Sequence, residues 1–189
     1  PFGSEAFRKD NLLQRSIRAV KERFPEVLVI ADIALDPFTS HGHDGLIDEN
    51  GIVLNDPTIT ELSNMALRDY EDGFCHVSLL SYCVKYTSAL YGPFREALNS
   101  SPKIGDKKNY QINPANSREA LLECKLDEEE GADLLLIKPA LTSLDIIAKL
   151  RASTLLPIGA YQVSGEYSMI MAASEKGWMG FGSSSNSNL

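Results

Sequence analysis

The stretch Gly131-Ala-Asp-Leu-Leu-Leu-Ile-Lys138-Pro139 decides the fold class of this 189-residue chain. Residues 134–138 are a short apolar run that ends in a lysine, a pattern typical of a strand buried on both faces of a parallel sheet. A helix over residues 117–130 is predicted before this strand, with Gly131 as its stop. A helix followed directly by a buried strand indicates a βαβ unit.

The same alternation of helices and strands extends along the rest of the chain. Further strands are predicted at residues 27–33, 77–82 and 157–163. Further helices are predicted at residues 10–24, with Asp10 as N-cap and Pro25 as the stop, from Thr58 (in a capping box with Glu61) to near Gly73, and at 166–176 before Gly177. This alternation predicts an α/β fold with a parallel sheet.

Polar and charged residues gather at the carboxyl ends of the predicted strands. They are Asp32, Asp36, Lys85, Lys138, Tyr161 and Ser164. Active sites of (β/α)8 barrels lie at this edge, and a doubly wound sheet would place a site similarly. The chain lacks the glycine patterns Gly-x-Gly-x-x-Gly and Gly-x-x-x-x-Gly-Lys-Ser/Thr, so a nucleotide-binding sheet has no support.

Lys138 is the first candidate for chemistry. An ammonium group at the end of a buried strand is costly unless it is paired or neutral, and a neutral amine is the form that attacks a ketone to make an imine. The alternative is a lysine with a buried stem whose ammonium reaches solvent. Lys85, just past the preceding predicted strand, favours the chemical interpretation, because two neighbouring ammonium groups disfavour each other's charge.

Composition and charge limit the function classes. The net charge is 18 − 26 = −8, which argues against nucleic acid and an anionic membrane surface as partners. No apolar run approaches the roughly 18 residues of a membrane span, and no signal peptide is visible. The chain has three cysteines, Cys75, Cys83 and Cys124. Their odd number argues against a disulfide scaffold, and their lack of metal-ligand spacing argues against a cysteine-rich zinc module. We therefore expect a reduced compartment, the cytoplasm, with a plastid as the alternative.

Six motifs in order along the chain carry a family resemblance. They are Asp32-Ile-Ala-Leu-Asp36-Pro-Phe-Thr-Ser-His-Gly-His-Asp44-Gly45, Ser81-Tyr-Cys-Val-Lys85-Tyr, Tyr91-Gly-Pro-Phe-Arg95, Gly105-Asp-Lys-Lys-Asn-Tyr-Gln111 with Asn113-Pro-Ala-Asn116, the Lys138 stretch, and Tyr161-Gln-Val-Ser164-Gly-Glu166. Together they resemble the porphobilinogen synthase family, also called δ-aminolevulinic acid dehydratase. The resemblance implies a TIM-barrel hydro-lyase that condenses two 5-aminolevulinates to porphobilinogen with loss of two waters, in tetrapyrrole biosynthesis.

The resemblance also implies roles for individual residues. Lys138 and Lys85 would be the catalytic Schiff-base lysines. Three residues would bind the carboxylate of one 5-aminolevulinate, namely Arg95, Lys107 and Gln111. Ser164 and Tyr161 would contact the other substrate. Phe94 and Tyr91 would lie in a lid over the site.

The resemblance separates metal-dependent branches of the family. Zinc-dependent members have cysteines at the positions of Ala34, Asp36 and Asp44, and thiolates select zinc whereas carboxylates suit magnesium. We therefore expect no zinc, and Mg²⁺ or a monovalent cation at Asp36 and Asp44, or only ion pairs there. Glu123 matches the acidic residue that holds an allosteric Mg²⁺. His41 and His43 are interpreted as satisfied loop histidines more readily than as ligands.

The chain also departs from the family pattern. About four of the eight strands of a barrel are recognisable, and a strand and helix of the family are missing before Lys85, near residues 71–77. We expect residues 1–179 to form a partial catalytic barrel and residues 180–189 a flexible tail, in a family whose intact members are homo-oligomers. Two alternatives stay open: an inactive fragment that only associates with homologues, and a class I aldolase-type lyase that needs one lysine.

Overall fold

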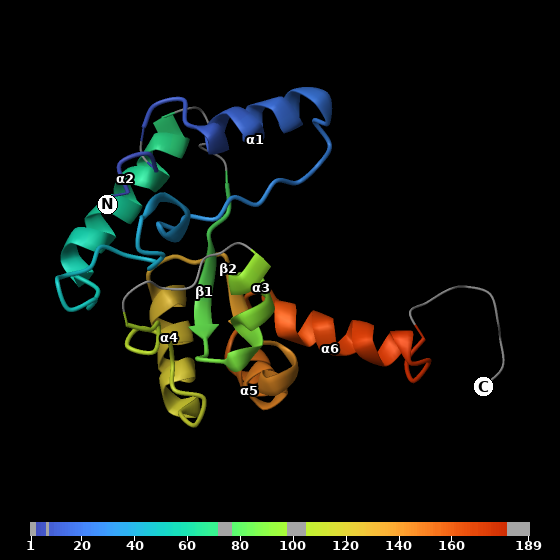
Figure 1. The fold of residues 1–189 in the computed structure, drawn as a ribbon. Coiled ribbons are helices and arrows are strands. Elements are labelled where there is room, and N and C mark those ends of the chain that lie inside the picture. The colour runs from blue at the N-terminus through green and yellow to red at the C-terminus, as the bar shows by residue number, and fades with distance from the viewer. Residues whose placement is uncertain (1–2, 7, 72–76, 98–104, 181–189) are drawn as a thin grey trace. The chain divides into compact units, whose positions relative to one another are not determined.

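The structure is a computed structural model that describes residues 3–6, 8–71, 77–97 and 105–180. The chain divides into two compact units, residues 1–77 with 100–110 and residues 78–99 with 111–189, and each is described by itself. The elements in Figure 1 are α1 (Leu12–Arg23), α2 (Asn55–Glu71), β1 (Leu80–Lys85), α3 (Gly92–Ala97), α4 (Ser117–Glu129), β2 (Leu134–Lys138), α5 (Leu144–Ser153), β3 (Ile158–Ala160) and α6 (Ser164–Glu175). Three short 3₁₀ helices are η1 (Asp36–Phe38), η2 (Ala89–Tyr91) and η3 (Leu141–Ser143).

The second unit is built on a parallel sheet. Its strands lie in the order β1-β2-β3, with β2 in the centre. Helix α4 packs on β1, α5 packs on α4 and β3, and Figure 1 shows α4 running alongside β1. The parallel α/β fold predicted from the alternation is therefore present, with three strands among the described residues.

Apolar packing between the sheet and its helices forms the main core. Leu135 and Ile137 of β2 are fully buried and belong to one core cluster with Val84 of β1 and with Ile146 and Leu150 of α5. Helix α4 begins where predicted, because the side chain of Asn116 accepts hydrogen bonds from the backbone N–H groups of residues 118 and 119. These packed elements hold the carboxyl ends of the strands in place.

In the first unit, α1 confirms the predicted helix but corrects its start. Asn11 is the N-cap, in a reciprocal capping box with Gln14, and Asp10 lies outside the helix in the left-handed region at φ 58°. Helix α2 begins at Asn55, before the predicted Thr58. The hydroxyl of Thr58 instead accepts a hydrogen bond from Leu46 N–H at 3.0 Å, so this residue anchors the preceding loop.

The strand predicted at residues 27–33 is wrong. No strand forms over this described segment, and Leu28 and Ile30 are 84% and 72% exposed. A buried strand requires a neighbouring strand for its backbone groups and apolar cover for its side chains. The small core of this unit instead gathers around Ala6, Leu35 and Met65.

Candidate active site

The two predicted Schiff-base lysines lie on neighbouring strands. Lys85 ends β1 and Lys138 ends β2, and their Cα atoms are register partners in the parallel pair. Side chains of register partners on parallel strands point to the same face, and neighbouring strands are about 4.8 Å apart. The sheet therefore brings the two lysines side by side at its carboxyl edge, where each side chain is partly buried.

Aromatic rings flank the Lys138 ammonium. Its Nζ lies 4.0 Å from the centroid of the Tyr82 ring and 5.2 Å from that of Tyr161. Tyr161 follows β3 directly, and its N–H donates to Ile137 O at 2.9 Å, so it is the neighbour of Lys138 on the side opposite Lys85. The predicted residue Tyr161 is thus adjacent to Lys138. Tyr82 had no predicted role. Strict alternation along β1 would place it on the face of Val84, away from Lys85, and only the register shift between Ser81 and Val84 lets its ring lie beside Lys138.

Gln111 lies on the other flank of β1. Ile112 pairs in parallel with Tyr86, and its N–H donates to Lys85 O at 3.0 Å. This extra pairing brings Gln111, which is 8% exposed, next to the end of β1. Four predicted residues of the second unit therefore follow one another along one edge of the sheet, in the order Gln111, Lys85, Lys138 and Tyr161.

The predicted lid is tied to the strand ends and to α6. The phenol of Tyr91 donates to Tyr86 O at 2.8 Å, and burial raises the pKa of that phenol above its ordinary value, so it stays a neutral donor. The Arg95 guanidinium lies 5.6 Å from the centroid of the Tyr91 ring. The hydroxyl of Ser164 donates to Leu90 O at 3.2 Å and accepts from Phe94 N–H at 3.0 Å. In this structure Ser164 therefore connects α6 to the lid.

Glu166 received no role from the sequence. It is fully buried and accepts three backbone N–H groups, from Val163, Ala140 and Leu141. Two of these donors follow Lys138 by only a few residues. A buried glutamate two residues after Ser164 carried no sequence signal beyond the capping position of a helix, because its distant partners are set by the fold.

Several other predicted residues lie in the first unit. Lys107 is 8% exposed, and its Nζ pairs with Asp44 Oδ1 at 2.7 Å. Asp36 begins η1. His43 is fully buried, and its Nδ1 lies 3.2 Å from the Tyr110 hydroxyl. The predicted substrate ligand and the predicted metal ligand thus neutralise each other here.

The carboxylates of this loop do not fit a dedicated metal site. Asp44 is engaged by an ammonium group, and the described residues contain no group of three or more His, Cys, Asp or Glu side chains arranged to hold an ion. The Lys107 ammonium at the Asp44 carboxylate would repel a Mg²⁺ ion bound there. Asp36 and Asp44, as placed here, therefore do not fit a resident Mg²⁺ ion.

Glu123 on α4 is a different case. Burial raises the pKa of its carboxyl group, and the neighbouring carboxylates of Asp127 and Glu119 add to the effect. A nearby cation would relieve this repulsion, and Mg²⁺ commonly keeps its waters while binding one or two carboxylates. The residues present therefore fit a single-carboxylate contribution to such an ion.

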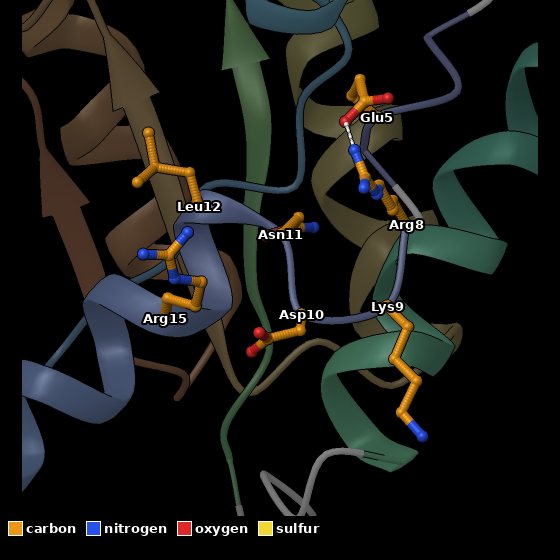
Figure 2. Close-up of a pocket in the computed structure, with 7 residues that line it drawn as sticks. All are labelled: Glu5, Arg8, Lys9, Asp10, Asn11, Leu12 and Arg15. Carbon is orange, nitrogen blue, oxygen red and sulfur yellow. Dashed lines mark hydrogen bonds and ion pairs between the residues drawn. The ribbon is translucent and has the colours of Figure 1, made fainter.

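A separate surface hollow lies at the start of α1, in the first unit. Figure 2 shows Arg8 turned toward Glu5, at 3.2 Å, and Lys9 extending away from that pair. The other lining residues are Asp10, Asn11, Leu12 and Arg15. None of the residues predicted to act in chemistry lines this hollow.

Among the described residues, no helix is both long enough and apolar enough to cross a membrane.

Comparison with known proteins places these observations in a family. The sequence profile described as delta-aminolevulinic acid dehydratase matches residues 1–73 and 69–185. The two stretches meet at residues 69–73, close to the point where a family segment was expected to be missing. The chain is 49% identical over 197 residues to the chloroplastic delta-aminolevulinic acid dehydratase of Pisum sativum, covering 91% of this chain and 50% of that protein. It is 51% identical to the chloroplastic protein of Hordeum vulgare, covering 91% and 46%.

A solved structure agrees with the sequence comparison. The delta-aminolevulinic acid dehydratase (porphobilinogen synthase) of Toxoplasma gondii ME49, in complex with the reaction product porphobilinogen, superposes with a TM-score of 0.88 at 43% identity. The match covers 94% of this chain and 58% of that one. The chain spans about half the length of the curated relatives it matches. The chain therefore belongs to the delta-aminolevulinic acid dehydratase family.

Proposed function

We propose that this chain acts as a porphobilinogen synthase, a hydro-lyase that condenses two 5-aminolevulinates to porphobilinogen with loss of two waters. The observation that carries the proposal is the register pairing of Lys85 with Lys138 at the carboxyl edge of the sheet. The product complex of the Toxoplasma gondii relative supports the substrate class. The aldolase alternative is not favoured, because the family that the chain matches is delta-aminolevulinic acid dehydratase.

The chemistry follows from the amine groups. The neutral amine of Lys138 would attack the ketone carbon of 5-aminolevulinate, and loss of one water would leave an imine. When protonated, the imine withdraws electrons, so the adjacent carbon releases a proton and can form the carbon–carbon bond. The rings of Tyr82 and Tyr161, which flank Nζ, would stabilise the cationic form through their π faces. Lys85 would hold the second substrate in the same way.

Substrate carboxylates would be bound by residues along the same edge and in the lid. Gln111 offers amide donors beside β1, and Arg95 offers a planar fork suited to a carboxylate. Lys107 would contribute a point charge once a substrate carboxylate competes with Asp44 for its ammonium. Tyr161 and Ser164 would contact the second substrate from the end of β3, and Phe94 would cover the site from α3.

We further propose that the three-stranded sheet is part of a (β/α)8 barrel. Residues 1–179 would form its catalytic part and residues 180–189 a tail, of which 181–189 lie outside the described residues. Glu123 would contribute to an allosteric Mg²⁺, whose binding would relieve its repulsion from neighbouring carboxylates. Assembly into a homo-oligomer is part of the same proposal.

A plastid is the location that the comparisons favour. The first relatives found, from plants, are chloroplastic proteins, and the cytoplasmic expectation receives no support from them. This part of the proposal rests on those names alone.

Borohydride trapping tests the proposed activity. Reduction in the presence of 5-aminolevulinate should leave a covalent adduct on Lys138, located by peptide mass spectrometry, and Lys138→Met should abolish it. Lys85→Met should stop porphobilinogen formation and spare the adduct on Lys138. Lys125→Met is the matched control, because this lysine is exposed on α4, and it should change neither result.

The full-length Pisum sativum relative serves as positive control in the same assay. If that relative formed the adduct and this chain formed none, the chain would be an inactive fragment and the proposed activity would be wrong.

A further inference from the structure

We propose that Glu166 is the positioning residue of Lys138, an inference that rests on the proposed Schiff-base function. Its side chain is fully buried near the start of α6. Its Oε2 accepts the N–H of Val163 at 2.6 Å and that of Ala140 at 3.3 Å, and its Oε1 accepts the N–H of Leu141 at 2.5 Å. One carboxylate thus joins the start of a helix to the chain that leaves β2.

The hydrogen bonds converge on the backbone that carries Lys138. Ala140 and Leu141 lie two and three residues after this lysine. Ala140 N–H also donates to Tyr161 O at 3.0 Å, and Tyr161 N–H donates to Ile137 O at 2.9 Å. Glu166 therefore fixes the point where β2 and β3 end, on which the placement of Nζ beside the Tyr161 ring depends.

Helix capping alone does not explain these contacts. Capping the start of α6 needs only the hydrogen bond that Val163 N–H donates to Glu166. Ala140 and Leu141 are 26 and 25 residues away in sequence and have no part in the cap. Among the described residues Glu166 forms no ion pair, so backbone N–H groups hold the carboxylate, and it in turn orders that backbone.

The start of α6 is itself held in place, which gives Glu166 a rigid base. A Cβ atom at Gly165 would come within 2.6 Å of Leu90 O, so the helix lies directly against η2. On the same helix, Ser164 is hydrogen bonded to Leu90 O. Because this end of α6 is fixed against the lid, the Glu166 carboxylate is also fixed. Its hydrogen bonds with Ala140 and Leu141 therefore restrain the backbone that follows Lys138.

The test compares three changes in the full chain. Glu166→Gln keeps the shape but places an NH₂ group against N–H donors. Glu166→Asp keeps the charge but is one methylene too short to reach Ala140 and Leu141. Val163→Pro removes one donor at a residue whose φ of −80° suits proline. Glu175→Gln, exposed at the other end of α6, is the matched control.

Two measurements are made on each variant. Amide hydrogen exchange follows the N–H groups of Ala140 and Leu141. Borohydride trapping with 5-aminolevulinate gives the maximal rate of adduct formation at Lys138 and the substrate concentration for half of that rate, both normalised to the folded fraction.

We expect Glu166→Gln and Glu166→Asp to speed both exchange rates and slow maximal trapping about tenfold, the effect of losing a hydrogen bond to a charged group. The half-saturating concentration should change less than about twofold, because the groups that bind the substrate carboxylate stay in place. Val163→Pro should give a smaller change in the same direction, and Glu175→Gln none.

Several results would overturn the inference. Unchanged exchange in Glu166→Gln would show that the carboxylate does not order this backbone. Faster exchange with an unchanged trapping rate would make Glu166 a structural residue only, and full rescue by aspartate would show that charge at the helix start suffices. Absence of any adduct in the unmodified chain would refute the proposed function, and the exchange rates would still decide whether Glu166 orders the Lys138 backbone.

Discussion

Two apolar runs of similar composition behave differently in this protein. Residues 27–33 and residues 134–138 both have the pattern of a strand buried on two faces. The second run is β2, the central strand, with Leu135 and Ile137 fully buried. The first forms no strand, and Ile30 is 72% exposed.

The two runs differ in the strands and helices that lie next to them. Strand β2 has a hydrogen-bonded strand on each side and the helices α4 and α5 packed in the same core. The first run continues from α1, where Lys21 Nζ donates to Val27 O at 2.9 Å, into η1 without joining the described sheet. An apolar, β-branched run becomes a strand only when another strand satisfies its backbone groups.

Amide hydrogen exchange should show the largest contrast between the two runs. The N–H groups of residues 135–137 should exchange more slowly than those of residues 28–33 by a factor of about 1,000 or more, because core strands open only with global unfolding. Exchange measured by NMR at a single pH tests this. Equal protection of the two runs would mean that residues 27–33 do join a sheet.

Matched isoleucine truncations should separate the runs in stability. Ile137→Ala removes a fully buried side chain and should lower the free energy of unfolding by about 2–5 kcal/mol. Ile30→Ala, at an exposed position, should change it by no more than about 0.5 kcal/mol. Urea unfolding followed by circular dichroism measures both values. A loss at residue 30 as large as that at residue 137 would contradict the comparison.

The stability of the first unit should depend on a buried ion pair, whereas that of the second depends on the packing of its sheet. Lys107→Met removes the ammonium that pairs with Asp44 in a largely buried position, and we expect a loss of about 1–3 kcal/mol. Lys108→Met is the adjacent control, because its pair with Asp106 is exposed and should contribute less than about 0.5 kcal/mol. The same urea experiment measures the loss of unfolding free energy in both variants. Equal losses would show that the Lys107–Asp44 pair contributes no more than an exposed ion pair.

The smallest expected effect concerns Glu123 on α4, the helix that covers β1. Burial, together with Asp127 and Glu119, raises the pKa of Glu123 in the folded chain. The unfolded chain therefore loses this proton first as the pH rises, so ionisation of Glu123 lowers stability above its folded pKa. Glu123→Gln should raise the urea midpoint at neutral pH and leave it unchanged in acid, below the ordinary glutamate pKa of about 4.3.

Glu128→Gln, at an exposed position on the same helix, controls for a general loss of negative charge. A drop in stability at neutral pH for the Glu123 variant would contradict the expected sign. Added Mg²⁺ should raise the midpoint of the unchanged chain more than that of Glu123→Gln if the proposed ion binds there.

Local signals in the sequence predicted most elements of the second unit. The range of β2 was predicted in full, and α4 was predicted to within one residue because a capping asparagine and a terminal glycine mark its ends. The strand predicted at residues 77–82 is displaced to Leu80–Lys85, and α5 was not predicted. Other errors occurred where two neighbouring residues compete for one role. Asn11 caps α1 in place of Asp10, since only Asn11 reaches the N–H of Gln14, and α2 begins before Thr58 because Thr58 binds the preceding loop.

For the candidate site, the sequence placed the lysines at strand ends but not their surroundings. That Lys85 and Lys138 share a register follows from strand pairing over 53 residues of sequence, which local patterns do not contain. The partners of Glu166 and the pairing of Lys107 with Asp44 have the same origin. A buried charge takes whichever partner the fold brings near, so its role is read only in three dimensions.

The sequence by itself determined the bounds of α4, the parallel α/β class and the placement of the two lysines near strand ends, because these depend on side chains a few residues apart. The tertiary structure alone decided which apolar run became a strand, which ring lies beside Lys138, and which backbone Glu166 holds. The physical reason is that hydrogen-bond partners and apolar cover are supplied by segments distant in sequence, and only packing selects among them.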